Sequence, residues 1–158
     1  MPLRPFSSML LFALLVGCGK SATDYQKDAQ KALDGGDAAK ATQLAEDGLK
    51  VSGDDKAVSW RLEQVHIDAL AKGGRGSELP KELDRLKAAY PAQVTAQFYK
   101  ALADKLGTAG DKAQIDVLDA GAKAFPTDPT FSDAITKIKG SAGASPEEVE
   151  RLKALGYL

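Results

Sequence analysis

Apolar residues recur at spacings of three and four from Tyr25 to Gly53, which is the spacing of one helix face. Gly35 and Gly36 interrupt this pattern, and the carboxylate of Asp37 can cap the helix that follows. The sequence therefore predicts two antiparallel helices joined by a tight turn. Their facing stripes consist of Tyr25, Ala29, Ala32 and Leu33 in the first helix and of Ala41, Leu44, Ala45, Gly48, Leu49 and Val51 in the second.

The segment 56–72 carries apolar residues on two sides, which predicts a helix packed between neighbours on both. One side holds Val58, Leu62, Val65 and Ala69, and the other holds Trp60, Ile67 and Ala71.

Four further helices are predicted after the break at 73–77. They are a helix at 79–90, a pair whose apolar stripes flank Gly110-Asp111, and a short helix opened by Asp128-Pro129. The stripes of the pair are Tyr99, Leu102, Ala103 and Leu106, then Ile115, Leu118, Ala122 and Phe125. Aromatic content is low and alanine is abundant, a mix that suits tightly packed helices better than a β-sandwich, so the predicted fold class is all-α.

A last helix is predicted at 146–155. Ser145-Pro146-Glu147-Glu148 combines a capping box with proline at the first helical position. Val149, Leu152 and Leu155 share one side of this helix, and charged residues occupy most of the rest. We expect 145–158 to be a capping helix that covers the apolar face of the preceding hairpin.

The Gly-Asp turns at Gly36-Asp37 and Gly110-Asp111, each followed by spaced Ala and Leu, resemble those of tetratricopeptide (TPR) repeats. The middle unit departs from that pattern, because it lacks the Gly-Asp turn and carries a few extra residues. The resemblance implies a TPR-like α-solenoid of about four antiparallel helical hairpins. It also implies a domain that binds other proteins.

The N-terminus has the features of a targeting signal: Arg4 precedes an unbroken apolar run from Met9 to Val16. The run ends in Leu15-Val16-Gly17-Cys18, which resembles the lipobox of bacterial lipoproteins. The resemblance implies a signal peptide at 1–17, acylation of Cys18, a short tether at 18–24 and a helical domain at 25–158. An ordinary secretory signal is the alternative, but Cys18 is the only cysteine and has no disulfide partner in the chain. By analogy with enteric lipoproteins, Gly19 after the cysteine favours the outer membrane, facing the periplasm.

Charge and composition argue against nucleic-acid binding and against a catalytic or metal site. The formal net charge of the 158 residues is −1, and no basic cluster suggests nucleic acid as a partner. His66 is the only histidine, so it would have to serve any imidazole-based metal or catalytic site alone, and we interpret it as a residue of a packed helix. The sequence predicts no enzyme activity, no metal and no cofactor.

Trp60 is the strongest candidate for a contact with a partner. In the register of the repeats, one concave groove would hold Gln26, Gln30, Asp34, Trp60, Gln64, Asp68, Gln97, Lys100 and Asp104. Alternatively, Trp60 is buried between hairpins and these polar residues are merely solvated.

Two functions follow from these alternatives. The first is a membrane-anchored adaptor for a protein partner in envelope assembly or secretion, which requires an open groove. The second is a structural or small-ligand lipoprotein that contacts cell wall or lipid, which a closed aromatic cavity would favour.

Overall fold

A computed structural model describes residues 19–107, 112–140 and 145–158, and everything below refers to these ranges. They contain eight α-helices, one 3-10 helix and no strand, which confirms the all-α prediction. The helices are α1 (Ala22–Asp34), α2 (Ala38–Val51), α3 (Lys56–Lys72), η1 (Gly76–Glu78), α4 (Leu79–Ala89), α5 (Ala96–Gly107), α6 (Ala113–Ala124), α7 (Pro129–Gly140) and α8 (Pro146–Ala154).

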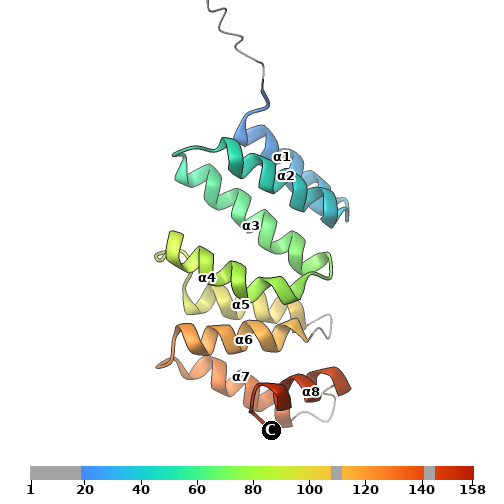
Figure 1. Ribbon diagram of the computed structural model, residues 1–158, viewed down its shortest axis with the longest axis vertical. Coiled ribbons are helices and arrows are strands. Elements are labelled where there is room, and N and C mark those ends of the chain that lie inside the picture. The colour runs from blue at the N-terminus through green and yellow to red at the C-terminus, as the bar shows by residue number, and fades with distance from the viewer. Residues whose placement is uncertain (1–18, 108–111, 141–144) are drawn as a thin grey trace, which may run out of the picture.

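The helices are stacked along the long axis of the molecule, from α1 and α2 at one end to α7 and α8 at the other (Figure 1). Helix α2 packs against α1 and α3, and α6 packs against both α5 and α7. Helix α6 also contacts α4 and α8, so it is the best-connected element of the second half. None of the described helices is both long enough and apolar enough to cross a membrane.

Capping residues fix where several helices begin. Asp37 accepts a hydrogen bond from the backbone N–H of Lys40, and Asp55 caps α3 in the same way. Ser145 forms the predicted capping box of α8. At α1 the cap is Ser21, and Asp24 completes its capping box from inside the helix. Helix α1 therefore begins within the segment 18–24 that the sequence predicted to be a tether.

Helix α3 confirms the prediction of two packed sides. Its first predicted stripe belongs to an apolar cluster with α1 and α2, and its second stripe belongs to the cluster of the remaining helices. Leu62 and Ile67, one from each stripe, are almost completely buried. Since the two clusters meet at α3, this helix joins the halves of the molecule.

Gly48 allows α1, α2 and α3 to approach closely. A Cβ at this position would lie 2.7 Å from Leu62 Cδ2 and 2.8 Å from Tyr25 Cβ, well inside van der Waals contact. The sequence placed Gly48 on the packing stripe of α2, and this crowding explains why a residue without a side chain occupies it.

Helix α8 is attached through the side predicted to be its packing face. Leu152 is fully buried in the second cluster, and Leu155 is half-buried against it. Arg151 is ion-paired with Asp116 of α6, and the hydroxyl of Tyr157 donates to Asp119 Oδ1 at 3.0 Å. Apolar and polar contacts therefore hold the C-terminal segment on α6.

Candidate functional site: two depressions beside helix α5

The exposed side of α5 is a ridge between two hollows in the surface. Gln97, Ala101 and Asp104 are exposed and lie one helical turn apart along this side. Ala101 lines a hollow on the α3 side, and Asp104 lines another on the α7 side. Because neighbouring residues of one ridge line the two hollows, both open on the same face of the molecule.

The first hollow, which we call the α3–α5 depression, has a volume of about 210 Å³. Its rim carries an ion pair in which Lys105 Nζ lies 2.8 Å from Asp68 Oδ1. Since both partners are exposed or half-buried, water screens this pair, and it contributes little to stability. The lining residues are Gln64, Ile67, Asp68, Phe98, Ala101, Leu102 and Lys105.

Trp60 lies one helical turn before Gln64 and is half-buried. Its ring centroid is 5.2 Å from that of Tyr90 and 5.5 Å from that of Phe98, which itself lines the α3–α5 depression. Trp60 is therefore packed against Tyr90 and Phe98 and still partly exposed, near the α3–α5 depression.

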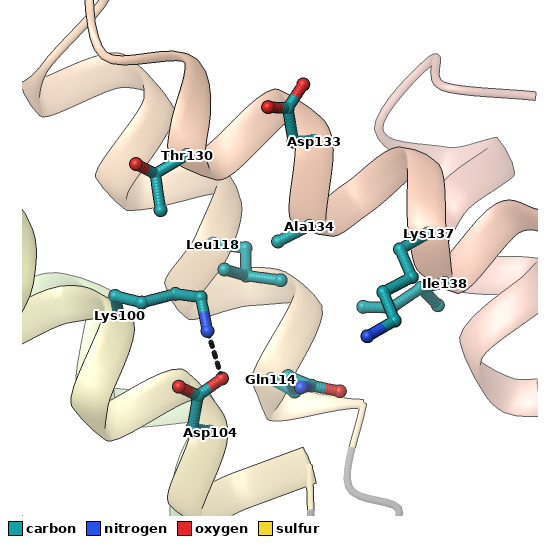
Figure 2. A pocket seen from close by; sticks show the side chains of 9 residues that line it. All are labelled: Lys100, Asp104, Gln114, Leu118, Thr130, Asp133, Ala134, Lys137 and Ile138. Atoms are coloured by element: carbon teal, nitrogen blue, oxygen red, sulfur yellow. Dashed lines mark hydrogen bonds and ion pairs between the residues drawn. The ribbon is translucent and has the colours of Figure 1, made fainter.

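The second hollow, the α5–α7 pocket, is larger, with a volume of about 570 Å³ (Figure 2). Leu118, Ala134 and Ile138 supply its apolar wall, and polar side chains surround that wall. Lys100 and Asp104, one turn apart on α5, form an ion pair. The remaining lining residues are Gln114, Thr130, Asp133 and Lys137.

The structure places the nine predicted groove residues at four positions. Gln64 and Asp68 line the α3–α5 depression, next to Trp60, and Lys100 and Asp104 line the α5–α7 pocket. Gln97 is exposed on the ridge and lines neither hollow. The three residues of α1 also line neither hollow: Gln26 and Gln30 are half-buried, and Gln30 donates to Asp34 at 2.8 Å.

Sequence reasoning missed the contribution of α7. Thr130, Asp133 and Lys137 follow one another at spacings of three and four and form one wall of the larger pocket. The Asp128-Pro129 signal that opens α7 was recognised, so extending the groove register by one more unit would have found them.

His66 is buried, as expected for a packed helix, with 7% of its surface exposed. Its Nε2 lies 3.6 Å from Glu46 Oε1, which is too long for a hydrogen bond. The part of the chain that the structure describes holds no group of three His, Cys, Asp or Glu side chains arranged to bind a metal ion.

Three of the buried carboxylates, Glu63, Asp116 and Asp119, lie in ion pairs, and Glu148 belongs to the capping box of α8. Glu63 of α3 is 3% exposed, and both its oxygens accept from the guanidinium of Arg85 on α4, at 2.8 and 2.6 Å. These hydrogen bonds raise the pKa of Arg85 above its usual range. This buried pair of Glu63 and Arg85 joins α3 to α4.

Tyr99 lies beneath the ridge, fully buried against Phe125 and Phe131 in edge-on contacts. Its hydroxyl has no hydrogen-bond partner among the described residues. Burial raises the pKa of Tyr99 to about 12, and the carboxylate of Asp84 acts in the same direction.

Comparison with protein-family models, with curated proteins and with solved structures finds no match to this chain.

Proposed function

We propose that this chain is a lipid-anchored adaptor whose helices form a TPR-like solenoid of four hairpins, α1–α2, α3–α4, α5–α6 and α7–α8. In this arrangement α3, α5 and α7 carry the protein-binding face. We further propose that the adaptor acts in the bacterial cell envelope, held at the outer membrane through Cys18 and facing the periplasm, and that it has no enzymatic role.

The observation that carries this proposal is the pair of hollows on one face. Four of the residues expected in a partner groove, Gln64, Asp68, Lys100 and Asp104, line these hollows. Hollows that combine an apolar wall with polar rims suit the side chains of an extended peptide or of a partner helix.

The alternative function, small-ligand binding, has weaker support. It calls for a closed aromatic cavity, whereas Tyr99, Phe125 and Phe131 are packed against one another in the core. The two hollows are open to solvent and are lined largely by polar and aliphatic side chains.

Lipidation of Cys18 is the other half of the proposal, and this residue lies outside the described part of the chain. Its support is the lipobox-like Leu15-Val16-Gly17-Cys18 behind a short apolar run. Several acyl chains give a stable anchor, because each buried methylene contributes about 0.8 kcal/mol.

Site-specific photocrosslinking in native cells tests the adaptor function. A benzophenone amino acid is placed at Ala101, on the ridge of α5, and in a second strain at Ala88, which is also an exposed alanine but belongs to α4. We expect Ala101 to give a discrete crosslinked partner and Ala88 to give none. Equal crosslinking from both positions, or from neither, would contradict a partner-binding face on α3, α5 and α7.

A further inference from the structure

The lining of the α5–α7 pocket indicates which kind of partner segment it accepts, provided that the proposed adaptor function holds. Three charged groups at its edge are already accounted for. Lys100 and Asp104 neutralise each other in an ion pair. The carboxylate of Asp133 points away from the other labelled side chains (Figure 2).

Lys137 is the charge that remains. Its side chain has no ion pair or hydrogen bond within the described part of the chain. Its side chain extends from α7 toward the interior of the pocket, where its ammonium lies on the same side as Gln114 (Figure 2). The pocket therefore offers an ammonium group that no carboxylate of its lining pairs with, beside an apolar wall.

The apolar wall consists of the side chains of three residues from two helices. Leu118 comes from α6, and Ala134 and Ile138 come from α7. Leu118 is almost fully buried, while Ala134 and Ile138 are half-buried, so the wall offers partly exposed aliphatic surface at the bottom of an open hollow. A volume of about 570 Å³ is ample for one branched aliphatic side chain.

From this arrangement we infer that the α5–α7 pocket binds an internal segment of a partner protein in which a leucine-sized aliphatic side chain is followed by an acidic one. The aliphatic side chain lies against Leu118, Ala134 and Ile138, and the acidic side chain pairs with Lys137. The α3–α5 depression lacks this combination, because the two charged residues of its lining, Asp68 and Lys105, pair with each other.

Isoleucine methyl groups provide reporters for both hollows. The chain has four isoleucines. Ile138 lines the α5–α7 pocket and Ile67 lines the α3–α5 depression, whereas Ile115 and Ile135 are buried in the core. Methyl NMR of the full-length protein in dodecyl maltoside therefore distinguishes binding at either hollow from a change in the fold.

The probes are synthetic hexapeptides with blocked ends, so that the only carboxylate is the glutamate side chain. The first is acetyl-Gly-Ser-Leu-Glu-Ser-Gly-amide, and matched peptides carry Gln or Lys in place of Glu, or Ala in place of Leu. We expect the Leu-Glu peptide to shift the Ile138 methyl. The Gln peptide is expected to bind about two- to fivefold more weakly, because an exposed ion pair contributes modestly. The Ala peptide is expected to bind about tenfold more weakly or worse.

Charge reversal at Lys137 tests the pairing directly. Lys137→Glu is expected to remove the preference for Glu and to favour the Lys peptide by a similar factor. Lys139→Glu is the matched control, because this lysine is also exposed on α7 but does not line the pocket. Unchanged Ile115 and Ile135 methyls would show that both variants keep the fold.

The inference is overturned if the Leu-Glu peptide shifts Ile67 rather than Ile138, if it shifts neither, or if Lys137→Glu and Lys139→Glu behave alike. None of these outcomes bears on the adaptor function, which the crosslinking comparison of Ala101 with Ala88 tests separately.

Discussion

Gly121 of α6 lies directly against the ring of Phe131 of α7. A Cβ at position 121 would be 2.3 Å from Phe131 Cε1 and within 2.7 Å of two further ring atoms. Phe131 is fully buried and stacks on Phe125 with a centroid distance of 6.3 Å, so its ring has little space in which to move. The contact between α6 and α7, which shapes the larger pocket, therefore depends on a residue without a side chain.

Gly121→Ala is expected to destabilise the protein, because overpacking of a full core costs about 1–3 kcal/mol. The better helix propensity of alanine offsets at most about 1 kcal/mol of this cost. Gly140→Ala is the control, since a Cβ there meets nothing within 4 Å at the end of α7. Urea denaturation of both variants decides the point, and equal stabilities would show that the ring of Phe131 yields readily.

Tyr99→Phe removes a buried hydroxyl that has no partner, so at neutral pH it is expected to leave stability unchanged or to raise it slightly. Tyr157→Phe, the matched variant, removes the hydrogen bond to Asp119 and is expected to cost about 0.5–1.5 kcal/mol. The ordering of the two midpoints in urea at pH 7 checks this prediction, and a larger loss for Tyr99→Phe would contradict it.

The same tyrosine predicts a loss of stability in alkali. The pKa of Tyr99 is raised to about 12 in the folded protein, compared with about 10 in an unfolded chain. The unfolded state therefore loses its proton first, and Tyr99 lowers stability by up to about 1.4 kcal/mol per pH unit as the pH rises from about 10 to about 12. Urea denaturation at several pH values across this range measures the effect. The free energy of unfolding should fall less steeply with pH for Tyr99→Phe than for wild type. Equal slopes would contradict the raised pKa.

The helices and their buried faces were largely predictable because a period of 3.6 residues is a local signal. The two stripes of α3 assign Leu62 and Ile67 to different sides, and the structure puts them in different clusters. The start of α1 was misjudged, because the sequence assigned 18–24 to a tether, whereas Ser21 caps the helix and α1 begins at Ala22.

The binding face was predictable only in part, because a hollow depends on which helices become neighbours. Asp68 and Lys100 were placed from the repeat register, and each lines a hollow. Asp34 has the same kind of register position on α1, but it lies at an end of the stack, beyond both hollows. Lys137 was missed because it lines the pocket only through the packing of α7 beside α5 and α6, which the sequence does not specify.

Cys18→Ser tests the anchor. The variant is expected to lose incorporation of labelled palmitate and either to leave the membrane fraction or to accumulate as an unprocessed precursor. Gly19→Asp is a useful comparison, since it is expected to keep the lipid and, in a bacterium with two membranes, to move the protein to the inner one. The lipoprotein interpretation is wrong if Cys18→Ser matures at the same site and still partitions with membranes.

The last prediction concerns the C-terminal segment 145–158, which we expect to stabilise the domain rather than to act as a detachable tail. Leu152 is fully buried, and the two acidic residues of α6 beneath the segment, Asp116 and Asp119, are 9% and 8% exposed. Removing the segment uncovers apolar surface and leaves both carboxylates without Arg151 and Tyr157. Truncating one packed leucine costs about 2–5 kcal/mol, out of about 5–15 kcal/mol for a whole domain.

Leu152→Ala is accordingly expected to lower the melting temperature by on the order of 10 °C, and deletion of 145–158 to lower it further and to promote aggregation. Leu158→Ala makes the same chemical change in the same segment, but Leu158 is 57% exposed, so this control should melt like wild type. Thermal melts followed by circular dichroism decide between the two ideas. Only a segment packed into the core can stabilise the helices beneath it. Deleting a detachable recognition tail would therefore leave the melting temperature unchanged, and it would abolish the crosslink from Ala101.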